Sequence, residues 1–158
     1  MGDPTTILGC REFLCIDPGG TTGYAHYYHH LGLEEPVIVL GQFETWSKLD
    51  QLIGWRDQDP SMLVVYEKPF FNPQVDPIVF EVTGAIKVVC DIYNVKIIDQ
   101  PANVPSYIYT RYAEHLTGVM RGTQHLKDAF AHMAYLLIRR GELDLQTVMQ
   151  AFYAGETL

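Results

Sequence analysis

One stretch, residues 13–25 with the sequence FLCIDPGGTTGYA, constrains the fold more than any other part of the chain. Four apolar residues lead directly into Asp17, and a turn of proline, glycine and threonine follows before the next aromatic residue. This pattern predicts a buried strand, a tight turn and a second strand. An ionised carboxylate at the end of a buried strand is destabilising unless a basic group, a set of donors or a metal ion compensates it. We therefore expect Asp17 to have partners elsewhere in the chain.

The order of the remaining elements indicates an α/β fold. One predicted helix has clear start signals, with Asp76 as its N-cap and Pro77 in its first position. The last helix is predicted to end at Gly141. Three strands joined by hairpins, followed by alternating helices and strands, predict a five-stranded mixed sheet flanked by helices, with three antiparallel strands and then two parallel ones. The predicted elements are strands over 11–16, 23–28 and 37–43, a helix over 45–55, a strand over 62–67, a helix over 76–93, a strand over 96–100, and helices over 103–116 and 125–140.

Length and composition predict a single domain. The chain has 158 residues, of which 47% are hydrophobic, enough for one substantial core. We expect this core over about residues 11–140, followed by a C-terminal helical tail over 141–158. Three cysteines without a CxxC pair argue against both a disulfide framework and a zinc ribbon. No apolar run suits a membrane span or a secretory signal, which predicts a cytoplasmic protein.

The net charge of −8 at first argues against a nucleic-acid partner. However, residues 86–140 hold seven Lys and Arg against four Asp and Glu, so the chain carries a local basic surplus. This segment includes the last long helix. An anion-binding face is therefore compatible with the acidic average.

Two other segments carry acidic residues in positions that resemble that of Asp17. Glu67 ends the apolar run LVVY, and the last helix, HLKDAFAHMAYLL, holds His125 and Asp128 three residues apart on one face, with His132 further along. If the first and fourth strands are neighbours and the last helix crosses their ends, Asp17, Glu67, His125 and Asp128 converge. For His132 we favour packing over metal ligation.

Three carboxylates and an imidazole in one place repel one another unless cations neutralise them. Oxygen-rich sites suit Mg²⁺, with Mn²⁺ as a substitute, and two ions about 4 Å apart are the usual device for phosphodiester displacement. The predicted cofactor is therefore a pair of Mg²⁺ ions. We expect His125 either to ligate a metal or to position and deprotonate the attacking water.

Three motifs together resemble the RuvC-type Holliday-junction resolvases, most closely their small bacteriophage members. They are IDPGGTTGYA, VVYEKPFF and HLKDAFAHMAYLL, and the resemblance covers about residues 11–140. It implies a ribonuclease H-like nuclease that cuts branched DNA with two Mg²⁺ ions. It further implies that Asp17, Glu67 and Asp128 are the metal carboxylates and that His125 is the histidine of an HxxD variant of the last motif.

The resemblance also predicts residues that contact DNA. The family has an aromatic residue three positions after its glutamate, used for stacking at the junction, and Phe70 has that place here. The family's lysines before the last helix are absent, and the corresponding segment offers only Arg111 before Arg121. The full set of predicted DNA contacts is Lys68, Phe70, Phe71, Arg111, Arg121 and Lys127.

Simpler interpretations remain open for each feature. Asp17 before Pro-Gly-Gly is also an ordinary turn former, Glu67 could pair with Lys68 or Lys127, and Phe70 with Phe71 could cap the core. Two other functional classes also compete. One is a junction-binding protein without nuclease activity, and the other is a phosphate-binding domain like those of actin and sugar kinases, suggested by DPGGTTG.

The long helix over 76–93 predicts a homodimer. Its apolar residues form a stripe wider than one sheet contact requires, and a two-fold dimer would match the two symmetric cuts that resolution of a four-way junction needs. The alternative is that the loop and terminal helix of the same chain cover the extra width. The stripe consists of Val79, Val82, Ile86, Val89 and Tyr93, widened by Ile78, Ala85 and Ile92.

Overall fold

The computed structural model describes residues 12–28, 37–54, 62–116 and 123–139, with the side chains of 112–116 excepted. Arg121, Cys10, the histidines at 29 and 30 and the predicted tail over 141–158 lie outside the described residues. The elements follow the predicted order, with ends that differ by at most two residues. They are β1 (Glu12–Asp17), β2 (Thr22–Tyr28), β3 (Val37–Phe43), α2 (Ser47–Gly54), β4 (Met62–Glu67), α3 (Ile78–Ile92), β5 (Lys96–Gln100), α4 (Val104–Leu116) and α5 (Gln124–Arg139).

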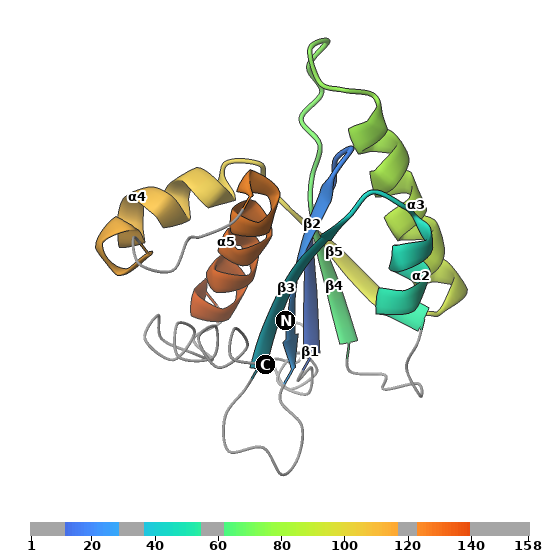
Figure 1. Ribbon diagram of the computed structural model, residues 1–158, viewed down its shortest axis with the longest axis horizontal. Helices are drawn as coiled ribbons and strands as arrows, with labels where there is room; N and C mark the ends of the chain where they lie inside the picture. Colours follow the sequence, from blue (N-terminus) through green and yellow to red (C-terminus); the bar gives the residue numbers. More distant parts are fainter. Residues whose placement is uncertain (1–11, 29–36, 55–61, 117–122, 140–158) are drawn as a thin grey trace, which may run out of the picture.

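The five strands form one mixed sheet in the order β3-β2-β1-β4-β5 (Figure 1). β1 pairs antiparallel with β2, and β2 with β3, whereas β1 with β4 and β4 with β5 are parallel. The predicted arrangement is confirmed, including the neighbouring first and fourth strands. All six residues of β1 are buried, which explains why this central strand is a continuous apolar run rather than an alternating one.

Helices cover both faces of the sheet, α4 and α5 on one side and α2 and α3 on the other (Figure 1). Alternate side chains of β1 point to opposite faces of the sheet. Phe13 and Cys15 pack in the core beneath α5, whereas Leu14 and Ile16 pack in the core beneath α3. None of the helices within the described ranges combines the length and apolar character needed to cross a lipid bilayer.

Side chains cap the two helices that matter most for the site. Asp76 Oδ1 accepts a hydrogen bond from the backbone N–H of Ile78 at 3.0 Å. The N-cap itself is Pro77, one residue later than predicted, and the regular helix begins at Ile78. Thr123 precedes α5, and its Oγ1 accepts from the N–H of Leu126 at 3.4 Å. The start of α5 is therefore fixed at Gln124, one residue before the predicted position.

The apolar stripe of α3 differs from the prediction. Ile78 and Ala85, assigned from the sequence to the extra face, instead pack against the chain's own core, which includes residues of α2 as well as of the sheet. Phe80, Val88 and Ile92 are 40%, 59% and 68% exposed. These three residues, spaced at i, i+8 and i+12, are called the α3 outer face below.

Candidate active site

The ends of two parallel strands and one helix bring the predicted site residues together. Asp17 is the last residue of β1 and Glu67 the last of β4, and these strands are parallel neighbours, so both carboxylates lie at one edge of the sheet. α5 packs on this part of the sheet (Figure 1). His125 Nδ1 lies 3.0 Å from Asp17 Oδ2, and His132 Nε2 lies 2.9 Å from Glu67 Oε2.

A glycine on β2 permits this close approach of α5. Gly23 pairs with Asp17 in the strand register, and a Cβ atom at Gly23 would overlap the backbone carbonyl of His125. Only a residue without a side chain lets the first turn of the helix lie this near to the strand. The preceding turn is closed by Thr22, whose hydroxyl donates to the carbonyl oxygen of Gly19 at 3.0 Å.

Asp17 has an environment that resists ionisation. Burial raises the pKa of its carboxyl to about 6, and the charges of Glu67 and Asp128 act in the same direction. The hydrogen bond from His125 opposes the rise. The charges of Glu67 and Asp128 therefore act on Asp17, and ionisation of Asp17 adds a further negative charge at this end of the sheet.

Asp128 is held by two side chains that the sequence did not single out. Tyr109 Oη on α4 and Gln124 Nε2 on α5 both donate to Asp128 Oδ1, at 2.8 and 2.7 Å. Burial, followed by the hydrogen bond to Asp128, raises the pKa of Tyr109 above its usual range. No sequence signal could have found Tyr109, because its role depends on how α4 packs against α5.

Glu67 has a partner that the sequence assigned to packing. His132 is fully buried, as packing requires, but both of its ring nitrogens are also hydrogen-bonded: Nε2 to Glu67 and Nδ1 to Gln100 Oε1 at 2.8 Å. Gln100 ends β5 as Glu67 ends β4, so a polar residue that closes an apolar strand was the signal available in the sequence. Glu67 pairs with neither Lys68 nor Lys127; the nearest carboxylate to Lys68 Nζ is that of Asp99, at 3.9 Å.

The aromatic pair in the loop after β4 is exposed. Phe70 and Phe71 are 73% and 89% exposed, so the alternative that they cap the core is wrong. The ring of Phe71 lies edge-on to that of Phe80, with centroids 6.2 Å apart. In Figure 1 this loop extends beyond the end of the sheet, on the way from β4 to α3.

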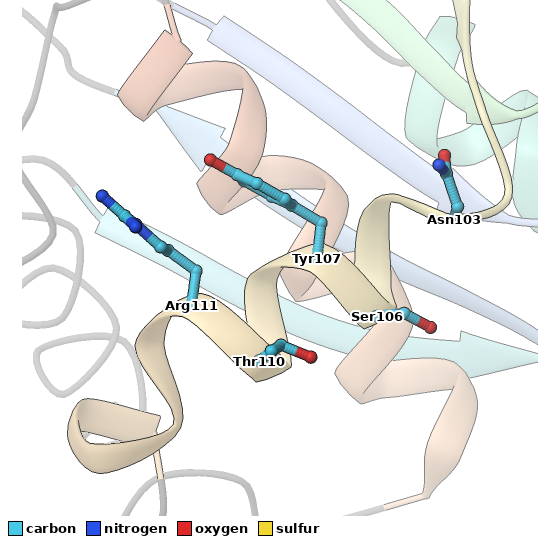
Figure 2. A pocket seen from close by; sticks show the side chains of 5 residues that line it. All are labelled: Asn103, Ser106, Tyr107, Thr110 and Arg111. Atoms are coloured by element: carbon cyan, nitrogen blue, oxygen red, sulfur yellow. The ribbon is translucent and has the colours of Figure 1, made fainter.

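The basic side chains that were predicted to contact DNA lie on different parts of the surface. Arg111 lines a shallow depression of about 630 Å³ on the outer surface of α4, together with Asn103, Ser106, Tyr107 and Thr110 (Figure 2). Tyr109, which contacts Asp128, lies about 160° from Arg111 around the same helix, on nearly the opposite side. Lys127 is half-buried beside Asp128 in the sequence. The structure thus joins Asp17 to His125 and Glu67 to His132, with Asp128 near enough for its charge to act on Asp17. It places Arg111 on a separate surface.

The donor types at the site fit divalent cations. Carboxylate oxygens with one imidazole are the ligands that Mg²⁺ and Mn²⁺ accept, and a cation would offset the charges of Glu67 and Asp128, which add to the effect of burial on the pKa of Asp17. Within the described ranges, no three His, Cys, Asp or Glu side chains lie close enough to enclose an ion. Binding would therefore require these side chains to exchange some of their present hydrogen bonds for metal contacts.

Comparison with known proteins reveals similarity in structure alone. Neither protein-family models nor curated protein sequences match the chain. RuvC of Thermus thermophilus is 17% identical, with a TM-score of 0.57 over 82% of this chain and 96% of that one. The same protein in complex with a Holliday junction substrate is 14% identical, with the same TM-score and coverage. The Fowlpox virus resolvase in complex with Holliday junction DNA is 12% identical, with a TM-score of 0.51 over 83% of this chain and 99% of that one.

These similarities define the class of fold. The chain has the ribonuclease H-like fold of the RuvC-type resolvases, a five-stranded mixed sheet with helices on both faces. The resemblance predicted from the three sequence motifs is thereby confirmed at the level of the fold.

Proposed function

We propose that this protein is a metal-dependent endonuclease that cleaves Holliday junctions or other branched DNA. The observation that carries the proposal is the meeting of the DPG, YEKP and HLKD motifs at one edge of the sheet. There Asp17 and Glu67 end adjacent parallel strands, and His125 contacts Asp17 from the first turn of α5. The same fold is present in two proteins whose structures contain Holliday junction DNA.

Asp17, Glu67, His125 and Asp128 are the residues that would hold the metal ions. Two Mg²⁺ ions, or Mn²⁺ in their place, supply the Lewis acidity that phosphodiester hydrolysis requires. Asp17 and Glu67 stand on strands, which are rigid enough to keep two ligands in a fixed relation. The small residues that follow Asp17 leave room for a phosphate beside it.

His125 has two chemical options at this site. Its Nδ1 donates to Asp17, which leaves Nε2 directed elsewhere on a side chain that is 42% exposed. The imidazole can therefore accept a proton from a water molecule near Asp17, or ligate a metal if the bond to Asp17 is given up.

Exposed groups around this edge would contact the DNA. Lys68 and the rings of Phe70 and Phe71 lie on the loop that follows Glu67, where the aromatic faces are accessible for stacking on unpaired bases. Lys127, Arg111 and Arg121 are the remaining proposed contacts. From its place on the outer surface of α4, Arg111 would meet a DNA arm rather than the scissile phosphate.

The proposed enzyme acts as a homodimer through the α3 outer face. Phe80, Val88 and Ile92 expose apolar side chains on the helix opposite to the α5 layer, and burying them against a second copy would remove this surface from water. A two-fold dimer presents two sites to the two strands that must be cut.

A junction-binding protein without nuclease activity is the second candidate. One observation favours it: each of the three carboxylates already accepts a hydrogen bond from α4 or α5. Among the described residues no ready-made metal cluster exists. Binding without cleavage in the presence of Mg²⁺ or Mn²⁺ would identify this function.

The deciding experiment compares labelled four-way junction, linear duplex and RNA–DNA hybrid, each with Mg²⁺, with Mn²⁺ or with EDTA. The proposal predicts symmetric cleavage of the four-way junction that requires the divalent ion, with little cleavage of the duplex. Equal cleavage of all substrates would contradict the specificity for branched DNA. Absence of cleavage with retained junction binding would favour the second candidate.

A further inference from the structure

We infer that His132 is a positioning residue, which fixes the carboxylate of Glu67 so that one oxygen is held and the other faces the reaction site. The inference rests on the proposed nuclease function. His132 Nε2 lies 2.9 Å from Glu67 Oε2. The other oxygen of Glu67, Oε1, has no hydrogen-bond partner among the residues that the structure describes. A carboxylate restrained in this way has a defined free oxygen to offer a cation.

The direction of the hydrogen bond follows from the chemistry of its two ends. An ionised carboxylate can only accept, so Nε2 of His132 carries the proton and donates it. Nδ1 lies 2.8 Å from Gln100 Oε1, and an amide can turn either its oxygen or its NH₂ group toward a ring nitrogen. Gln100 can thus support the imidazole without competing for the proton that Glu67 requires.

Burial explains why this histidine is not an ordinary core residue. His132 is completely buried, and its neighbours along α5 are apolar: Ala129, Phe130, Ala131, Met133, Ala134, Leu136 and Leu137. An apolar side chain of similar size would pack here without needing any hydrogen-bond partner. The specific contribution of a histidine is therefore its link between Glu67 and Gln100.

The end of β5 restrains Glu67 in two ways at once. The carbonyl oxygen of Gln100 accepts from the N–H of Lys68 at 2.8 Å, which fixes the main chain directly after Glu67. The Gln100 side chain, itself buried, supports His132, which fixes the carboxylate. Groups that orient metal ligands in this manner typically change metal affinity or activity by about 10- to 100-fold when removed.

The test uses three variants of the full chain. His132→Leu removes both hydrogen bonds, and His132→Gln keeps an amide donor near the place of Nε2. His26→Leu is the matched control, because His26 also contacts a buried carboxylate, with Nε2 2.6 Å from Glu12 Oε1, at the opposite end of β1 from Asp17. Each variant is measured for junction cleavage against Mg²⁺ concentration, junction binding in EDTA, Mn²⁺ binding by electron paramagnetic resonance, and thermal unfolding.

We expect His132→Leu to lower the single-turnover cleavage rate or the apparent metal affinity about 10- to 100-fold, with junction binding in EDTA unchanged. His132→Gln should recover much of the loss, and His26→Leu should cleave like the wild type whatever its melting temperature. In a Glu67→Gln background, His132→Leu should cause no further loss of Mn²⁺ binding, because His132 acts through Glu67.

Wild-type cleavage and metal binding by His132→Leu would overturn the inference while leaving the proposed function intact, as would a His132→Gln variant no better than His132→Leu. If His132→Leu does not fold, Gln100→Leu replaces it, with reduced metal affinity expected and wild-type affinity contradicting the inference. A wild-type protein that neither cleaves junctions nor binds Mn²⁺ would refute the proposed function, and with it this role of His132.

Discussion

The two helical layers of the molecule depart from the usual distribution of polar and apolar groups in opposite directions. α5 buries a histidine and directs further polar side chains toward the ends of β1 and β4. α3 exposes large apolar residues to solvent on its outer face. A polar group inside and an apolar group outside are each unfavourable in an isolated domain, so each marks a surface with another use. In the proposed function, the α5 layer carries the chemistry and the α3 layer binds a second copy of the chain.

The largest effect is expected from Asp128 on the α5 layer. Asp128→Asn should reduce cleavage of a four-way junction to background, because a proposed metal ligand loses its charge, while junction binding stays intact or becomes slightly tighter. Asp17→Asn and Glu67→Gln should behave in the same way. Gel-based cleavage and binding assays measure both properties. Near-normal cleavage by any of the three variants would remove that carboxylate from the site.

The α3 layer should respond to charge by losing the partner rather than the chemistry. Val88→Glu or Ile92→Glu should convert a dimer into a monomer, because a charge in an apolar interface must be desolvated. Light scattering at micromolar concentration measures the mass, against 18.0 kDa for one chain. The matched control is Val39→Glu, an exposed valine on the edge strand β3, which should remain dimeric. A wild-type protein that is monomeric with and without junction DNA would refute the role given to this layer.

The raised pKa of the buried Asp17, which lies beneath the α5 layer, should appear as a dependence of stability on pH. The raised pKa of Asp17 means that between about pH 4 and pH 6 the folded protein retains a proton that the unfolded chain has released. The free energy of unfolding therefore falls as the pH rises through this window. Asp17→Asn lacks this loss, so its stability relative to the wild type should rise by about 2–3 kcal/mol between pH 4 and pH 7.

Urea unfolding in EDTA at several pH values measures this difference. Saturating Mg²⁺ should shrink it, because a bound cation offsets the repulsion among the carboxylates. Parallel pH profiles of the two proteins would show that Asp17 ionises normally and that the carboxylates do not interact as the structure indicates.

The loop between β4 and α3 should contribute to both properties, DNA binding and dimer formation. Phe70→Ala and Phe71→Ala should each weaken binding of branched DNA by about 1–3 kcal/mol, the usual contribution of a base–aromatic stack. Only Phe71→Ala should also weaken the dimer, since Phe71 contacts Phe80 on the α3 outer face. Fluorescence anisotropy and light scattering separate these effects, and both variants should unfold at the wild-type temperature. A weaker dimer with Phe70→Ala would contradict the prediction that Phe71 alone of this pair contributes to the dimer.

The spacing of apolar residues and the turn residues between apolar runs were sufficient to predict the helices and strands. The strands VIVLGQF, MLVVYE and KIIDQ occur as predicted, because short apolar runs between turn residues have few other solutions in a chain of this size. The convergence of Asp17 with His125 was likewise accessible, since motif spacing and the order of strands determine which ends meet. Roles in catalysis remain predictions.

Contacts between helices could not be predicted from the sequence in the same way. Tyr109 contacts Asp128 because α4 packs against α5 at one particular rotation, and no local pattern in the sequence specifies that rotation. The same holds for the outer face of α3, where the sequence assigned Ile78 and Ala85 to a partner and they pack against the chain's own core instead. Which apolar residues remain exposed depends on how far the neighbouring layer extends.

From the sequence we could predict the order of elements, the two buried strands that end in Asp17 and Glu67, and the face of the last helix that carries His125 and Asp128. These features depend on neighbours within one strand or a few helical turns. Packing of the layers, in contrast, joins His132 to Glu67 and Gln100, and it places the backbone of His125 against Gly23 beside Asp17. These contacts join residues more than 30 positions apart in the sequence, and they exist only once the layers have packed.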